Sequence, residues 1–119
     1  MVCKVLILED EPLIAWDIEE ELISRGWDVV ATAATIASAF DALAAHNPEI
    51  AVLDVNLGKE TSFDLARHCA SNGTAVVFLT GQSAGSGPED LRHVPICSKP
   101  VDYNALQAVL EAAATQLGT

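Results

Sequence analysis

Short apolar runs alternate with longer amphipathic segments along the chain. The apolar runs lie at residues 2–8, 28–33, 49–54, 74–80 and 95–98, and β-branched and aliphatic side chains dominate them. This composition predicts five strands. The first run contains a single charged residue and is typical of a strand that is buried on both faces of a sheet.

The segments between these runs have the spacing of helices. Ile14, Ile18 and Leu22 recur every four residues and form one apolar stripe, which predicts a helix over residues 13–25. Two acidic residues and Pro12 precede this stripe and suit a capped first turn. Further helices are predicted after the capping residue Thr35, over residues 62–71, and from Asp102 onward.

Strands and helices therefore alternate, and the connections are too long for hairpins. This order predicts parallel strands joined by right-handed crossovers, with helices on both faces of one sheet. Residues 55–61 are predicted to form a loop. Residues 81–88 (GQSAGSGP) break the pattern, and only residues 89–93 after them have a helical composition. A helix between the last two strands is therefore expected to be short or disordered.

Composition restricts the class of protein. The chain has 119 residues, half of them apolar, which predicts one folded domain. Acidic residues outnumber basic ones by 17 to 6 and give a formal charge of −11, which argues against a nucleic-acid-binding surface. No apolar run has the length of a membrane span, and the first residues do not resemble a secretion signal. We therefore expect a cytoplasmic protein that binds neither nucleic acid nor membrane.

The cysteines and tryptophans suggest packing roles. Cys3, Cys69 and Cys97 are odd in number and far apart, so they fit neither a disulfide framework nor a zinc site, and we expect reduced, mostly buried thiols. Trp16 and Trp27 are expected to be partly buried.

Charged and polar residues follow four of the predicted strands. Glu9, Asp10 and Glu11 follow the first strand, Asp54 ends the third, Thr80 ends the fourth, and Lys99 follows the fifth. Ligands of an open parallel sheet bind outside the carboxyl ends of its strands. We therefore expect three of these carboxylates, a hydroxyl and an ammonium group to form one site.

The charges of this predicted site indicate its chemistry. Three neighbouring carboxylates repel one another unless a cation joins them, and all-oxygen ligands suit Mg²⁺. With the metal bound, Asp54 can attack phosphorus and become an aspartyl phosphate. Lys99 would neutralise charge on the transferred group, and Thr80 would donate a hydrogen bond to it.

The strand-end segments together resemble the receiver domain of two-component response regulators. The matching segments are LILEDEP at the first strand, AVLDVNLG around Asp54, VVFLTG at Thr80 and CSKP at Lys99. The resemblance covers essentially the whole chain. It implies a flavodoxin-like α/β fold, a doubly wound sheet of five parallel strands in the order 2-1-3-4-5.

The same resemblance implies a role for each site residue. Glu9, Asp10 and Asp54 would bind Mg²⁺ together with the backbone carbonyl of Asn56, and Asp54 would accept the phosphoryl group. Thr80 and Lys99 would contact that group. The peptide bond between Lys99 and Pro100 would be cis.

The resemblance also implies partners. A sensor histidine kinase or a phosphotransfer protein would supply the phosphoryl group, and the protein would be a signalling component and not an enzyme. Residues 1–119 are expected to form a single receiver domain with no room for an output domain. The signal would then leave by protein–protein contact or by draining phosphate from the kinase. A monomer or a weak dimer is expected, and the downstream target is open.

Some positions depart from the common receiver pattern. Ile96 occupies the position, three before the lysine, where many receivers have an aromatic residue whose rotation reports phosphorylation. Phe78, Thr80 and Gly81 partly match a Phe-Ala-Thr-Gly run that is typical of an atypical subgroup of receivers with a short or disordered fourth helix. This departure keeps open an alternative, a pseudo-receiver that binds partners without phosphorylation.

An aspartate-nucleophile phosphatase is a second alternative. Such enzymes have a D-x-D pattern after an early strand, whose second aspartate is the general acid. Here the pattern is Asp54-Val55-Asn56, so no acid is available at that position.

Overall fold

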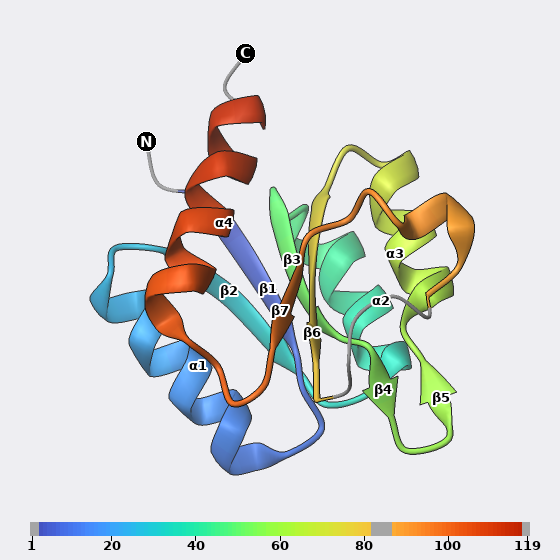
Figure 1. Cartoon of the computed structure of the whole chain (residues 1–119), viewed down its shortest axis with the longest axis horizontal. Helices are drawn as coiled ribbons and strands as arrows, with labels where there is room; N and C mark the ends of the chain where they lie inside the picture. Colours follow the sequence, from blue (N-terminus) through green and yellow to red (C-terminus); the bar gives the residue numbers. More distant parts are fainter. Residues whose placement is uncertain (1–2, 82–86, 118–119) are drawn as a thin grey trace.

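A computed structural model describes residues 3–81 and 87–117. Its main sheet has five parallel strands in the order β2-β1-β3-β6-β7 (Figure 1). Because β6 and β7 are the fourth and fifth strands of this sheet along the chain, the predicted order 2-1-3-4-5 is confirmed. The strands of this sheet are β1 (Lys4–Leu8), β2 (Asp28–Ala33), β3 (Ile50–Asp54), β6 (Ala75–Thr80) and β7 (Ile96–Ser98). The central position of β3 explains its composition, because all five of its residues are buried.

Helices cover both faces of the sheet, as the alternating pattern predicts (Figure 1). They are α1 (Pro12–Ser24), α2 (Ile36–His46), α3 (Phe63–Ser71) and α4 (Tyr103–Leu117). α1 and α4 pack on one face around Ile18, Leu106 and Leu110, and α2 and α3 pack on the other around Leu43 and Leu65. The sheet thus lies between two apolar layers.

The helix starts follow local sequence signals. Pro12 occupies the first turn of α1 as expected, but the side chain of the preceding Glu11 makes no capping hydrogen bond. The backbone carbonyl of Glu11 instead accepts a hydrogen bond from the Ala15 amide at 2.9 Å. Thr35 begins α2 with a capping box, in which its hydroxyl accepts from the Ser38 amide while the Ser38 hydroxyl accepts from the Thr35 amide.

The segment after Asp54 differs from the prediction. The expected loop at residues 55–61 contains a small antiparallel hairpin, formed by β4 (Asn56–Leu57) and β5 (Glu60–Thr61). Gly58 lies in its turn with a φ of +64°, a conformation that glycine adopts without strain. Sequence periodicity could not show this hairpin, because two-residue strands are too short to carry a pattern.

The connection from β6 to β7 has almost no helix in its described part. It contains one turn of 3-10 helix, η1 (Glu89–Leu91). The expectation of a short or disordered helix is therefore confirmed for residues 87–94, and residues 82–86 lie outside the described part of the chain.

Other expectations concern single residues. The peptide bond between Lys99 and Pro100 is cis, as the resemblance implied. All three cysteines are free thiols, and Cys69 and Cys97 are buried. Trp27 is half-buried as expected, but Trp16 is largely exposed, so the expectation for Trp16 was wrong. Among the helices described here, none has the length and apolar character needed to span a bilayer.

Candidate functional site

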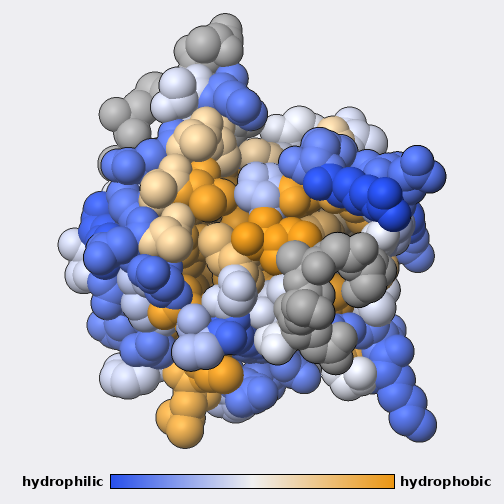
Figure 2. All heavy atoms as spheres, viewed as in Figure 1, coloured by the Kyte–Doolittle hydropathy of each residue, from blue (hydrophilic) through white to orange (hydrophobic). Residues whose placement is uncertain are grey.

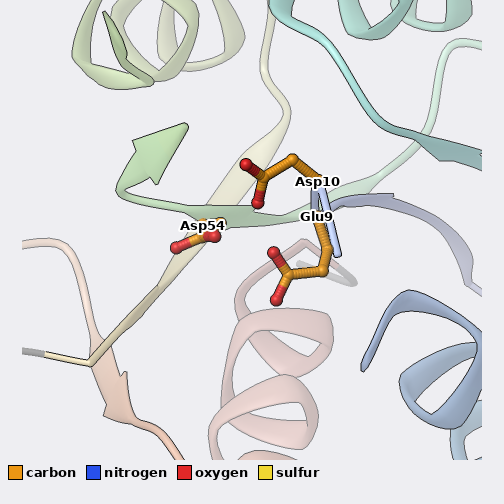
Figure 3. A group of neighbouring side chains, drawn as sticks. All are labelled: Glu9, Asp10 and Asp54. Carbon is orange, nitrogen blue, oxygen red and sulfur yellow. The ribbon is translucent and has the colours of Figure 1, made fainter. Parts of the chain in front are cut away.

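The predicted site residues meet at the carboxyl edge of the sheet. Glu9 and Asp10 follow β1, and Asp54 is the last residue of β3, which pairs with β1. The Glu9 amide donates to the carbonyl of Ala33 in β2 at 3.0 Å and so extends the strand pairing to this residue. Figure 3 shows the carboxyl groups of Glu9, Asp10 and Asp54 turned toward one common space beyond the two strands.

The three carboxylates form a compact cluster. Each offers one oxygen such that these oxygens all lie within 4.8 Å of one another. Glu9 and Asp54 are buried, whereas Asp10 is exposed and forms the solvent side of the cluster. Like charges at this spacing raise the free energy of the ionised cluster, so it favours a bound cation.

Lys99 lies between the two buried carboxylates. Its ammonium nitrogen is 2.6 Å from Oε1 of Glu9 and 3.0 Å from Oδ2 of Asp54. Only 18% of the Lys99 side chain is exposed, against 0% for Glu9 and 7% for Asp54, so little water screens these ion pairs. The ion pairs of Lys99 therefore link the end of β7 to the ends of β1 and β3.

Burial and neighbouring charge shift the pKa values of Glu9 and Lys99 in opposite directions. Burial raises the pKa of Glu9 above its ordinary value, and the hydrogen bond from Lys99 only partly offsets this effect. Burial by itself would lower the pKa of Lys99, but its hydrogen bonds to Glu9 and Asp54 and their negative charges together raise it. Lys99 therefore stays protonated at neutral pH, whereas the ionised form of Glu9 is disfavoured.

The second carboxylate oxygen of Glu9 indicates whether a cation fits this cluster. Oε2 of Glu9 is buried and has no hydrogen-bond partner among the described residues. A buried carboxylate oxygen without a partner costs about 1–3 kcal/mol or more, so it is a candidate ligand atom. The oxygens of Glu9, Asp10 and Asp54 are also the donor type that Mg²⁺ prefers. The residues present therefore fit a small hard cation.

Thr80 and Asn56 lie beside this cluster on neighbouring elements. Thr80 is the buried last residue of β6, and its carbonyl accepts a hydrogen bond from the Lys99 amide at 2.8 Å. This bond holds the backbone of Lys99 next to the end of β6. Asn56 is exposed in β4, two residues beyond Asp54, and pairs with Thr61 of the hairpin.

Two features of the site region were missed from the sequence. Strand-end positions placed Glu9 and Lys99 at the same edge, but no sequence signal showed that they form a short ion pair, which depends on side-chain conformation. The exposure of two large apolar residues on α1, Leu13 at 81% and Trp16 at 62%, was also missed. Their spacing of three residues was the available signal, because it places both on one side of a helix.

Known proteins resemble this chain over most of its length. Residues 5–111 match the family described as "Response regulator receiver domain". The transcriptional regulatory protein PdtaR of Mycobacterium tuberculosis is 30% identical over 117 residues, which cover 95% of this chain and 57% of PdtaR.

Solved structures agree with this match. The BeF3-activated conformation of SdrG from Pseudomonas melonis superposes with a TM-score of 0.79 and 36% identity, covering 93% of this chain and 94% of SdrG. The response regulator PhyR from Brucella abortus gives a TM-score of 0.81 and 27% identity, covering 99% of this chain and 52% of PhyR. The chain thus spans only a little over half the length of PdtaR and PhyR. By the match of its sequence and its fold, this chain belongs to the response regulator receiver domain family.

Proposed function

We propose that the protein is a signalling component that accepts a phosphoryl group onto Asp54 in a Mg²⁺-dependent reaction. The observation that carries this proposal is the position of Asp54, whose carboxylate lies 3.0 Å from the Lys99 ammonium and within 4.8 Å of the Glu9 and Asp10 carboxylate oxygens. A carboxylate held between a fixed cation and a metal-binding cluster is equipped to take an anionic group that its own negative charge would otherwise repel.

The proposed step is a transfer from phosphohistidine. A carboxylate oxygen of Asp54 forms a bond to phosphorus, the phosphorus–nitrogen bond breaks, and the imidazole nitrogen leaves with the electron pair. Lys99 neutralises part of the charge on the phosphoryl oxygens, and the Thr80 hydroxyl donates a hydrogen bond to one of them. Mg²⁺, held by Glu9, Asp10, Asp54 and the backbone carbonyl of Asn56, would neutralise further charge on the transferred group.

The phosphodonor would be a sensor histidine kinase or a phosphotransfer protein. α1 begins two residues after Asp10, and its exposed Leu13 and Trp16 lie near the site in sequence and on one side of the helix. Exposed tryptophan side chains are typical anchors of protein–protein contacts, and apolar neighbours exclude water around them. We therefore assign this end of α1 to the contact with the donor, which acts inside the cell.

The signal would leave by contact with another protein or by drainage of phosphate from the kinase. Ile96 stands where an aromatic residue is common in receivers, and 40% of it is exposed. Its side chain has no ring whose rotation could report phosphorylation, so any conformational response would use other residues. The structure of SdrG described above is of a BeF3-activated conformation, which supports the proposal that this chain also has an activated conformation.

Intact-mass spectrometry tests the proposal. The protein is incubated with Mg²⁺ and acetyl phosphate, and then with a phosphorylated histidine kinase, alongside Asp54→Asn and the matched control Asp41→Asn on the exposed surface of α2. We expect one phosphoryl group on the wild type and on Asp41→Asn, none on Asp54→Asn, and none when the metal is chelated.

The alternative function gives a different result. A pseudo-receiver that binds partners without phosphorylation would gain no phosphoryl group from either donor. The absence of the expected aromatic residue at Ile96 is the observation that favours this alternative. A phosphoryl group found on both the wild type and Asp54→Asn would also contradict the proposal, because it would place the modification elsewhere.

A further inference from the structure

The four asparagines of the chain differ in the residue that follows each of them. An asparagine can lose its side-chain amide when the backbone nitrogen of the next residue attacks its Cγ, and asparagine is therefore among the chemically labile residues of proteins. A side chain on the next residue hinders this attack, and a proline has no N–H to lose. The residues that follow Asn47, Asn56, Asn72 and Asn104 are Pro48, Leu57, Gly73 and Ala105, in that order. Asn72 therefore has the least hindered neighbour.

The structure places this pair of residues at the surface. Asn72 is the C-cap of α3, and Gly73 follows it in the loop to β6; both are exposed. This loop lies at the upper edge of the molecule in Figure 1, and Figure 2 shows mainly hydrophilic and intermediate side chains along that edge. Both residues also line a cavity of about 290 Å³ between the ends of α2 and α3. Water therefore reaches the Asn72 side chain.

The backbone around Gly73 decides how readily the attack can occur. Asn72 has a ψ of 9°, which turns the Gly73 nitrogen away from the Asn72 side chain, so this peptide must rotate before the nitrogen can reach Cγ. The Gly73 amide resists rotation only weakly, because its hydrogen bond to the Ala70 carbonyl is 3.3 Å long. The Thr74 amide, 2.9 Å from the Cys69 carbonyl, is the stronger restraint. The reaction therefore needs the last turn of α3 to open locally, as helix ends do at low cost.

The nitrogen that would leave already has a proton-exchanging neighbour. Nδ2 of Asn72 donates to the carbonyl of His68 at 2.9 Å and lies 3.1 Å from Nε2 of the His68 ring. Imidazole is the side chain that exchanges protons near neutral pH. In its protonated form, the His68 ring can therefore donate a proton to Nδ2 as this nitrogen departs.

We propose that Asn72 is a site of spontaneous modification, at which a cyclic imide formed with Gly73 converts the asparagine into aspartate and isoaspartate. The Gly73 nitrogen forms a bond to Cγ of Asn72 and loses its proton to solvent. The bond from Cγ to Nδ2 breaks, and Nδ2 leaves as ammonia with a proton from His68. Water then adds to one of the two imide carbonyls and breaks its bond to the nitrogen. Attack at Cγ gives aspartate, and attack at the backbone carbonyl gives isoaspartate.

Either product would weaken the end of α3. A carboxylate at residue 72 cannot donate to the His68 carbonyl as Nδ2 does. Its negative charge also lies at the carboxyl end of a helix, where the helix dipole disfavours anions, and Glu49 lines the same cavity. The modification would therefore loosen the connection between α3 and β6. This inference does not depend on phosphorylation of Asp54.

Peptide mass spectrometry of aged protein tests the inference. The unphosphorylated protein is kept at neutral pH, below its unfolding transition, and samples are digested after increasing times. The mass increase from replacing NH₂ by OH is read at each of the four asparagines, so three of them serve as internal controls. Gly73→Ala tests the need for glycine, and His68→Gln tests the ring, with His46→Gln on exposed α2 as its matched control. Circular dichroism checks that each variant folds, since an alanine is strained at the Gly73 φ of +78°.

We expect Asn72 to be modified at least about tenfold faster than Asn56 and Asn104, and Asn47 to stay unmodified. The peptide with residue 72 should give two product peaks of equal mass, aspartate and isoaspartate. Equal rates at Asn72, Asn56 and Asn104 would overturn the site, whether or not Gly73→Ala folds. A single aspartate peak would overturn the imide.

The variants separate the roles of the two neighbours. Gly73→Ala should slow the reaction at Asn72 about tenfold, because its methyl group hinders the attacking nitrogen. His68→Gln should slow it about threefold, since glutamine cannot supply the proton, and His46→Gln should leave the rate unchanged. The same rate in His68→Gln as in the wild type would overturn the role of the ring.

Discussion

Removal of the Lys99 charge is the most informative perturbation of the site. In Lys99→Met the two ion pairs are lost, at 2.6 Å to Glu9 and 3.0 Å to Asp54, and the buried carboxylates remain. With an effective dielectric constant of about 20, these contacts correspond to about 6 and about 5.5 kcal/mol of Coulomb attraction, most of which offsets the cost of desolvating the three groups. Loss of one partner of such a buried pair costs about 3–5 kcal/mol, and we expect a loss of stability in that range.

Urea unfolding followed by tryptophan fluorescence measures this loss, and Lys59→Met in the exposed turn of the hairpin is the control. Burial raises the pKa of Glu9, so Glu9 adds stability when protonated, at low pH, and this contribution is lost as the pH rises through its raised pKa. The loss in Lys99→Met should therefore be smaller at pH 5 than at pH 8. Millimolar Mg²⁺ should stabilise the variant more than the wild type. A loss no larger than that of Lys59→Met would refute the assigned role of Lys99.

Three further predictions concern stability and titration. Leu110→Ala should lower the free energy of unfolding by about 3 kcal/mol in urea titrations, because the side chain is fully buried between α4 and the sheet. Ser62→Ala should raise the free energy of unfolding by about 1 kcal/mol, because the hydroxyl is buried with no hydrogen-bond partner in the described part of the chain. A less stable variant would contradict this prediction. Tyr103 is the only tyrosine of the chain. Burial raises its pKa most, and its 2.6 Å hydrogen bond to Asp17 raises the pKa further. This contact therefore stabilises the fold below about pH 10, and its contribution is lost as the pH rises further. Absorbance titration of Asp17→Asn should show a lower pKa for Tyr103, and an unchanged value would exclude the contact.

The fold could be predicted from the sequence because it depends on local, periodic patterns of apolar residues. Residues 50–53 (IAVL) are apolar throughout, as is typical of a central parallel strand, and the stripe of Ile18 and Leu22 defines the buried side of α1. The predictions failed where a feature was too short to show a period. The hairpin of β4 and β5 has two residues in each strand, and a loop was expected in its place.

Part of the candidate site could likewise be predicted from the sequence, and part could not. Strand ends indicated Glu9, Asp10, Asp54, Thr80 and Lys99, because parallel strands carry their carboxyl ends to one edge of the sheet, whereas Asn56 followed only from the resemblance to receiver domains. The pairing of Lys99 with both Glu9 and Asp54, and the unpartnered oxygen of Glu9, could not be named, because they depend on side-chain positions.

The order of apolar and polar residues in this chain is enough to predict a parallel sheet and the acidic edge where a phosphoryl group would be accepted, since these follow from periodicity and from the geometry of parallel strands. The strand order followed from the resemblance to receiver domains. Tertiary packing alone decides how the charges are shared within that edge and which surfaces stay open. Leu13, Trp16 and Ile96 are as apolar as the core residues around them, and only the arrangement of the neighbouring elements leaves them exposed. Burial is a property of the packed molecule, and a residue's own side chain does not specify whether another element will cover it.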